Sequence, residues 1–247
     1  MRRLLAAAVL LCAGTPAIAA DGASLNVIGF SPDSKYFAFE QYGIQDASGF
    51  PYWDVFVLDL EKNQWVKDSP LHVVVEDETK TVSAAHAKAK GPAAALMNEY
   101  GILEPPVILA ATPATEVVAD RTHVVFDRSY TSRGAPDSAL VFPDIRYELK
   151  VETKPMPLPG ICDPQGGPYF GFTLSLQDFK SKTWHAIYAD DSLPASRGCI
   201  LGYDLAAVAA QQGVPGTDRL VAIVGVYAKG FEGADHRYIA VPFVLPK

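Results

Sequence analysis

Short runs rich in Val, Ile, Tyr and Phe recur along this chain, and clusters of Gly, Pro, Asp and Ser separate them. Such runs fit the pleated surface of a sheet, whereas the residues between them favour turns. The pattern predicts an all-β fold of antiparallel sheets with short helical insertions, arranged either as propeller-like blades or as a β-sandwich. The expected strands are residues 25–30, 36–42, 53–60, 107–110, 123–127, 146–152, 169–176, 184–188, 220–228 and 237–245.

The run 220–228 is apolar at every position, and 237–245 follows it after a short polar loop. A strand that is apolar on both faces is typical of a central strand with packing layers on either side. We therefore expect these two segments to pair near the middle of the fold.

Two segments interrupt the β pattern and favour helices. Residues 80–101 are rich in Ala and contain Pro92, which suits a first helical turn, and Gly101, which suits a helix end. We expect a hairpin of two short helices there. A second helix is expected at 205–212, with Gly213 after it.

The segment from Gly29 to Trp65 has the most specific pattern. Ser31-Pro-Asp-Ser34 forms a tight turn between two strand-like runs, and a Gly- and Asp-containing loop leads to the next run. The segment resembles one blade of a β-propeller, which implies four strands between residues 25 and 66. A weaker version of the same order of strand-like runs and loops lies at 200–245.

Read whole, GFSPDSKYFAFEQYGIQDASGFPY also resembles the opening of a family of bacterial predicted secreted proteins, a domain of unknown function. The resemblance covers about residues 26–67. It implies export from the cytoplasm, and it implies no activity or catalytic residues.

Residues 1–20 have the layout of a secretory signal peptide: Arg2 and Arg3, a short apolar run, and small residues up to Ala19 or Ala20, after which cleavage is expected. The apolar run is about half of the roughly 20 residues that a membrane-spanning helix needs. Cys12 should leave with the leader. Residues 21–247 are then expected to form a single β-rich domain, or two packed halves at 21–135 and 136–247, in the periplasm or outside the cell.

Loss of the leader makes the chain more acidic. It keeps 19 basic residues against 28 acidic ones, a net charge of −9. Such a chain repels phosphate backbones, so a nucleic-acid partner is not expected. The remaining apolar runs are too short to span a bilayer, so we also expect no integral membrane segment after cleavage.

Candidate binding residues lie on two loops. Asp46, Ser48, Gly49 and Tyr52 belong to the loop between two expected strands, and Tyr169 follows a Gly-Gly-Pro turn. Polar and aromatic loop residues on a rigid scaffold often recognise ligands. The alternative is that these residues shape the turns and that the tyrosines pack at strand starts.

Motifs of the common enzyme classes are absent from the sequence. It has no Gly-x-Ser-x-Gly, no His-Glu-x-x-His, no phosphate-binding Gly-rich loop and no EF-hand loop, and its five histidines are scattered. We assign no catalytic residue, no metal and no cofactor. Glu40 and Asp54 could face each other across a hairpin as an acid and its base, although two solvated carboxylates are commoner.

Three functions fit this pattern. A periplasmic binding or interaction module for an envelope protein or a small ligand agrees best with a strong scaffold and weak catalytic signals. The alternatives are a hydrolase whose active site is assembled from distant segments and a structural envelope protein.

Cys162 and Cys199 remain after cleavage and are expected to form a structural disulfide in an oxidising compartment. The exported protein should show no free thiol until it is reduced. Cys162→Ser should lower the melting temperature, because closing this loop is worth at most about 4 kcal/mol. The double variant with Cys199→Ser is the control for effects of the unpaired thiol. Two titratable thiols in the native protein would contradict the prediction.

Overall fold

The structure is a computed structural model that describes residues 21–113, 116, 120–127, 146–157, 160, 162–163, 167–179, 181–211 and 219–245. The expected leader, residues 1–20, and Gly213 lie outside this set. In chain order the elements are β1 (Ser24–Phe30), β2 (Tyr36–Ile44), β3 (Pro51–Asp59), β4 (Gln64–Trp65), β5 (Leu71–Val74), α1 (Val82–Glu99), β6 (Pro106–Ala111), β7 (His123–Asp127), β8 (Arg146–Pro155), β9 (Phe170–Asp178), β10 (Trp184–Ala189), the 3-10 helix η3 (Ala195–Arg197), β11 (Ile200–Gln211), β12 (Arg219–Lys229) and β13 (Ala234–Val244).

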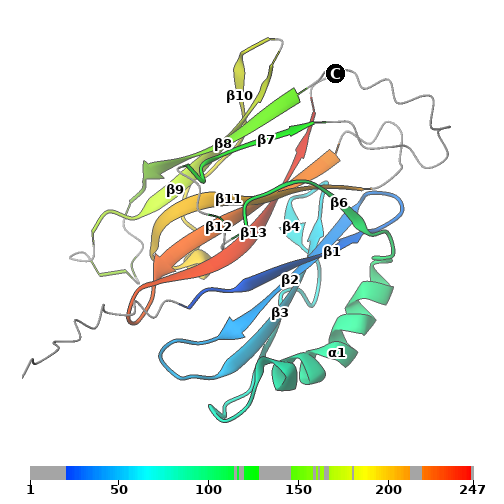
Figure 1. Cartoon of the computed structure of the whole chain (residues 1–247), viewed down its shortest axis with the longest axis vertical. Helices are drawn as coiled ribbons and strands as arrows, with labels where there is room; N and C mark the ends of the chain where they lie inside the picture. The colour runs from blue at the N-terminus through cyan, green and yellow to red at the C-terminus, as the bar shows by residue number, and fades with distance from the viewer. Residues whose placement is uncertain are drawn as a thin grey trace, which may run out of the picture.

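Three antiparallel sheets make up the described fold (Figure 1). The N-terminal sheet has the order β1-β2-β3-β4, and β5 pairs with the same edge of β3 as β4. The central sheet has the order β13-β12-β11-β6, and the outer sheet the order β10-β9-β8-β7. The expected all-β, antiparallel fold is confirmed, as are the four strands of the blade-like first segment. The sheets do not close into a ring.

The central sheet is buried on both faces. One face packs on Phe172, Leu174 and Leu176 of the outer sheet, and the other packs on Phe37 and Phe39 of the N-terminal sheet. This arrangement confirms the expectation that 220–228 is a central strand. Both contacts remove apolar surface from water, which is the main favourable term in folding.

Helix α1 covers the far face of the N-terminal sheet. Ala85, Ala89 and Leu96 are its buried residues, and they lie on one helical face because they are four and seven positions apart. The expectation of two short helices is wrong. A single helix runs through Pro92, which lies in its interior rather than its first turn. Proline removes one helical hydrogen bond, and packing of this face on β3 compensates for the loss.

Gly101 follows α1 with a φ of +62°, as expected for a helix end. Among the described residues, no helix is long and apolar enough to cross a membrane.

The expected helix at 205–212 is wrong, because residues 205–211 belong to β11, and 212 lies outside the described residues. Their alanines favour a helix in isolation. In the fold they lie in the most buried strand of the central sheet, where Ala207 and Ala209 leave room for the aromatic side chains of the N-terminal sheet. Bulges in the pairing of β11 shift which side chains face each layer.

The expected disulfide is present. Cys162 and Cys199 are bonded, with their Cα atoms 5.6 Å apart. The bridge joins the turn before β9 to the start of β11, so it ties the outer sheet to the central sheet.

The tight contact at Ala209 generates a prediction about stability. Its side chain is fully buried between two sheets. Ala209→Leu should therefore destabilise the protein by roughly 1–3 kcal/mol through overpacking, as measured by urea unfolding. Ala186→Leu is the matched control, because Ala186 is exposed on β10. Equal stability of the two variants would show that the layers do not pack tightly at this position.

Candidate functional site

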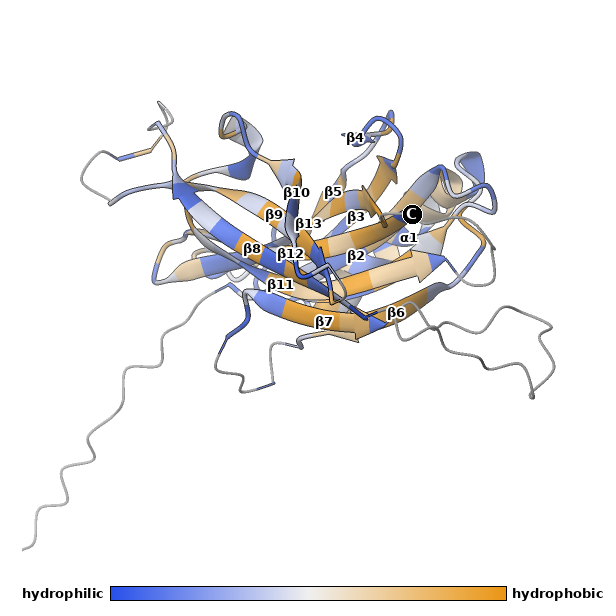
Figure 2. Cartoon of the chain, turned by 90° about the horizontal axis from the view of Figure 1, so that it is seen from above, coloured by the Kyte–Doolittle hydropathy of each residue, from blue (hydrophilic) through white to orange (hydrophobic). Residues whose placement is uncertain are grey.

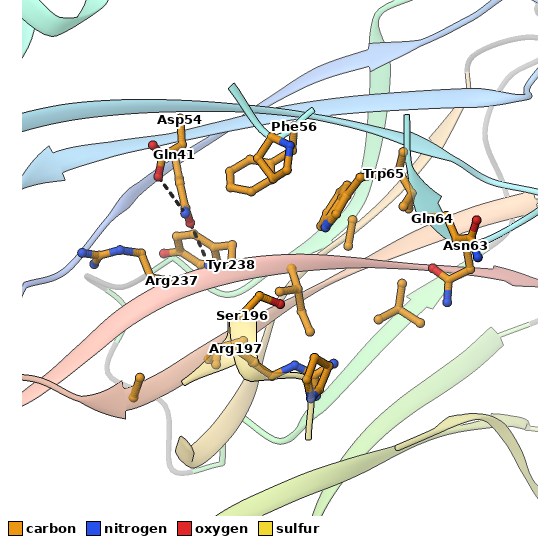
Figure 3. A pocket seen from close by; sticks show the side chains of 18 of the residues that line it. Gln41, Asp54, Phe56, Asn63, Gln64, Trp65, Ser196, Arg197, Arg237 and Tyr238 are labelled. Carbon is orange, nitrogen blue, oxygen red and sulfur yellow. Dashed lines mark hydrogen bonds between the residues drawn. The ribbon is translucent and has the colours of Figure 1, made fainter. Parts of the chain in front are cut away.

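A groove of about 620 Å³ runs along β13, the edge strand of the central sheet. Seen from above, β3, β4 and β5 rise on one side of β13 and β10 on the other (Figure 2). The close-up shows side chains from both walls directed towards the space beside β13 (Figure 3). The groove is lined by Gln41, Asp54, Phe56, Leu58, Asn63, Gln64, Trp65, Pro70 and His72, by Tyr188, Pro194, Ser196 and Arg197, and by Val226, Ala228 and residues 237–241.

Aromatic rings form most of the first wall. Phe56 of β3 and Trp65 of β4 lie 5.3 Å apart between ring centroids, and Phe39 stacks on Phe56 from beneath at 4.6 Å. The tight turn between β3 and β4 holds Trp65 in place, because Asp59 accepts a hydrogen bond from the backbone N–H of Lys62. Trp65 is nevertheless 38 % exposed. An aromatic surface that is fixed from behind and open in front is suited to contact with a ligand.

A His–Asp pair closes one end of this wall. Asp54 and His72 are cross-strand partners in β3 and β5, and His72 Nδ1 lies 3.0 Å from Asp54 Oδ1. Gln41 donates to the other carboxylate oxygen of Asp54 at 3.3 Å. The hydrogen bond that His72 donates to Asp54 raises the pKa of His72 above its ordinary value, and burial opposes this only partly. The His72 imidazole therefore holds its proton to higher pH than a free histidine.

The second wall is fixed by a buried ion pair. Arg197 Nη1 donates to Asp190 Oδ2 at 2.6 Å, and Asp190 also accepts from the backbone N–H of Phe172 and from the Tyr188 hydroxyl. The Arg197 guanidinium lies over the Phe172 ring, 5.3 Å from its centroid. Burial acts to lower the pKa of Arg197, but the interactions with Asp190, Tyr203 and Tyr188 together outweigh it and the pKa is raised. Arg197 thus stays charged and anchors the wall.

At the Asp54 end of the groove, Arg237 of β13 binds the start of the described chain. It forms an ion pair with the Asp21 carboxylate, donates to the Asp21 carbonyl at 2.9 Å, and lies 4.7 Å over the Tyr52 ring. The Tyr52 hydroxyl donates to Asp21 at 3.3 Å. These contacts hold residues 21–23 against the edge of β13.

The polar groups of the groove are bonded mainly to one another. Within the described ranges, no hydroxyl or thiol is hydrogen-bonded to His72, so the Asp54–His72 pair has no attached nucleophile. The same ranges contain no group of three or more His, Cys, Asp or Glu that could hold a metal ion. What the groove offers is aromatic surface, the arginines of two ion pairs, Arg197 and Arg237, and a strand edge without a strand partner among the described residues beyond Tyr238.

The suggested pairing of Glu40 with Asp54 is wrong. In the register of β2 and β3, Glu40 lies opposite Val55, and Asp54 lies opposite Gln41. Successive side chains of a strand point to opposite faces, so the two carboxylates are directed to different sides of the sheet. Glu40 instead accepts hydrogen bonds from Trp53 Nε1 and from the Asn26 side chain.

The structure places the predicted binding residues outside the groove lining. Ser48 donates to the Gln45 side chain, and Gly49 has a φ of +68° in the β2–β3 turn. Asp46 accepts from the backbone N–H of Glu232, in the β12–β13 loop. These contacts shape and brace the turn, which agrees with the alternative reading of the loop. A role for the loop in binding stays a prediction.

Tyr52 and Tyr169 are both 2 % exposed. Tyr52 lies beneath Arg237, and the Tyr169 hydroxyl donates to the carbonyl of Asp163 near the disulfide. The structure does not bring Tyr169 together with the β2–β3 loop, since one belongs to the outer sheet and the other to the N-terminal sheet.

Sequence reasoning missed the residues that form the groove. Phe56 and Trp65 lie in the segment recognised as a blade, and His72 lies after it. An aromatic residue in a strand gives no sign of which face is exposed. Arg197 and Tyr238 come from segments far away in the sequence. The pairing of His72 with Asp54 could not be predicted either, because no strand was expected at 71–74.

The fold and the groove define a β-rich protein of stacked antiparallel sheets with a cleft at the edge of its central sheet. The chain belongs to the family of predicted secreted proteins (DUF2259), whose model matches residues 38–243. The resemblance seen in the opening segment is thereby confirmed, and the family description agrees with the expected export. No curated protein matches the chain.

The His72–Asp54 pair generates a prediction about pH. Because the pKa of His72 is raised in the folded state, the pair contributes stability that is fully present below about pH 6.5 and is lost as pH rises through the folded pKa. Asp54→Asn should return the His72 pKa towards its ordinary value, as followed by NMR titration. The His185 resonances, from another sheet, serve as the internal control. An unchanged His72 titration in the variant would show that Asp54 does not set this pKa.

Proposed function

We propose that this protein is an exported binding module that holds its ligand in the groove beside β13. The observation that carries the proposal is the groove itself: about 620 Å³, walled by Phe56 and Trp65 on one side and by Tyr188 and Arg197 on the other. Ligand pockets are commonly of this size, mainly apolar, and equipped with a few fixed polar groups.

The walls of the groove are held in place by contacts within the protein, which supports binding. The buried Arg197–Asp190 pair fixes one wall, and Phe39 packed behind Phe56 fixes the other. A site that is formed in advance loses little conformational entropy when the ligand arrives. The groove therefore combines a formed shape with an exposed aromatic surface.

The proposal includes the location of the protein in the cell. Cleavage after Ala19 or Ala20 would leave Asp21, which Arg237 holds, in the mature chain. Residues 21–247 would act as one domain in the periplasm or outside the cell, with an envelope protein or a small molecule as ligand. Its acidity disfavours nucleic acid.

The alternative of a hydrolase rests on the Asp54–His72 pair, which resembles the base and the orienting carboxylate of a catalytic triad. A raised pKa of His72 extends the pH range in which the imidazole is protonated, and the protonated form donates hydrogen bonds but cannot act as a base. The pair is therefore better suited to recognising an acceptor group on a ligand.

A photocrosslinking amino acid at Asn63 tests the proposal, because Asn63 lies on the rim of the groove next to Trp65. Expressed in the periplasm, this variant should give a discrete crosslinked product. The same amino acid at Lys88, on exposed α1, is the matched control and should not give that product. Adding Trp65→Ala to the Asn63 variant should reduce the yield at least fivefold.

Equal products at positions 63 and 88, or a yield that Trp65→Ala does not change, would contradict binding in the groove. A crosslinker at Ser48 tests the β2–β3 loop separately. A crosslinked product at Ser48 but not at Asn63 would show that the β2–β3 loop, rather than the groove, binds the ligand.

A further inference from the structure

The edge of β13 that faces the groove has backbone groups without partners. β13 pairs with β12 along one edge only. In an antiparallel strand, alternate residues direct their N–H and C=O groups to opposite edges. The N–H groups of His236 and Tyr238 bond outside the sheet, to the Asp21 carbonyl and the Gln41 side chain. The backbone N–H and C=O groups of the even-numbered residues of β13 therefore point away from β12.

Part of this outer edge is already occupied by an extended segment. His236 donates to the Asp21 carbonyl at 2.8 Å and accepts from the Ala23 N–H at 3.0 Å, so residues 21–23 run parallel to β13 as a short added strand. At Tyr238, the amide of Gln41 takes the place of a backbone group at 2.8 Å. The edge of β13 thus accepts peptide-like partners in this structure.

Beyond Tyr238 this edge has no strand partner among the described residues, although Ala240 itself is only 6 % exposed. Ala240 is the next outward-facing residue and lines the groove, and no described residue is hydrogen-bonded to its N–H or C=O on that side. Pro242 follows at the next outward position and has no N–H to offer. Proline in a sheet is confined to edges where its missing N–H would point away from the ladder. The stretch of open edge is therefore short.

The walls of the groove determine what can reach this edge. Phe56 and Trp65 lie on one side of β13 and Arg197 on the other (Figure 3). Tyr188, which lies beside Arg197, also lines the groove. A second folded sheet would meet these walls before its edge reached Ala240. A single extended chain can enter, and its successive side chains would point alternately to the two walls.

From the open edge at Ala240 and the walls around it, we infer that the groove binds an extended polypeptide segment, which adds as a strand to β13 and places an apolar or aromatic side chain against Phe56 and Trp65. This inference rests on the proposed function and names its ligand class. Addition of a strand to a sheet edge is a recurring mode of peptide recognition: backbone hydrogen bonds give affinity, and pockets for alternate side chains give selectivity.

The test uses the full mature chain and peptides selected on it from a displayed library of random octapeptides. Peptide affinity is measured by calorimetry for the wild type and for Ala240→Pro, which removes the outward N–H but leaves the hydrogen bonds of its neighbours to β12. Ala240→Gly is the matched control, since it changes the same position but keeps the outward N–H. We expect Ala240→Pro to weaken binding at least tenfold and Ala240→Gly less than threefold.

A second measurement is independent of whether Ala240→Pro folds. N-methylation of the peptide at single positions should abolish binding to the wild type at alternate residues only, because a β-strand presents every second N–H to its neighbour. Bound peptide should also slow hydrogen exchange of the Ala240 amide. Methylation effects without this alternation, or unchanged exchange at Ala240, would overturn the inference.

The outcomes separate the inference from the proposed function. Peptides that lose affinity in Trp65→Ala but bind Ala240→Pro like the wild type would leave a binding groove and overturn strand addition. Failure to select any peptide sensitive to Trp65→Ala would overturn the peptide as ligand, and the crosslink at Asn63 would still decide whether the groove binds something else.

Discussion

Burial of the central sheet on both faces is the constraint on which the rest of the structure depends. Val221 and Ile223 of β12 face the N-terminal sheet, Ala222 and Val224 face the outer sheet, and all four are fully buried. A strand without a polar face is stable only if a layer covers each side, since each Å² of apolar surface left in water costs roughly 25 cal/mol. The N-terminal sheet in turn needs α1 on its far face. The order of the layers follows from these requirements.

The groove arises where the layers end. β13 is the last strand of the central sheet, whereas β3, β4 and β10 extend past it on either side, so the edge lies in a recess. Such an edge is protected from pairing with other sheets, as natural proteins generally arrange. The recess keeps its shape because a buried ion pair, Arg197–Asp190, fixes the position of one of its walls. Loss of one partner of a buried ion pair such as Arg197–Asp190 would leave an uncompensated charge, which typically costs about 3–5 kcal/mol.

A second buried polar cluster lies in the central sheet, on the face towards the N-terminal sheet. Asp204 of β11 accepts from Arg121 and from the Tyr227 hydroxyl, each at 2.8 Å, and His236 lies 3.6 Å away. Gly225 lies between these strands, and a Cβ atom at that position would collide with both the carboxylate and the imidazole. Glycine is therefore required there, and the cluster links β11, β12 and β13 to the segment before β7.

The amino-acid sequence by itself determined the local structure: the β class, the strand pair 220–228 and 237–245, the blade-like first segment, the partners of the disulfide and membership of a secreted family. These features follow from residue pattern over short stretches. Prediction from the sequence failed where contacts with distant segments override the local preference for a helix or a turn. The alanines of β11 favour a helix until two layers of aromatic and aliphatic side chains cover them, and Pro92 favours a break until one face of α1 packs on β3. The groove depended on tertiary structure alone, because Trp65, Arg197 and Ala240 approach each other only when three sheets stack, and whether a backbone N–H is paired depends on which strand lies at the edge.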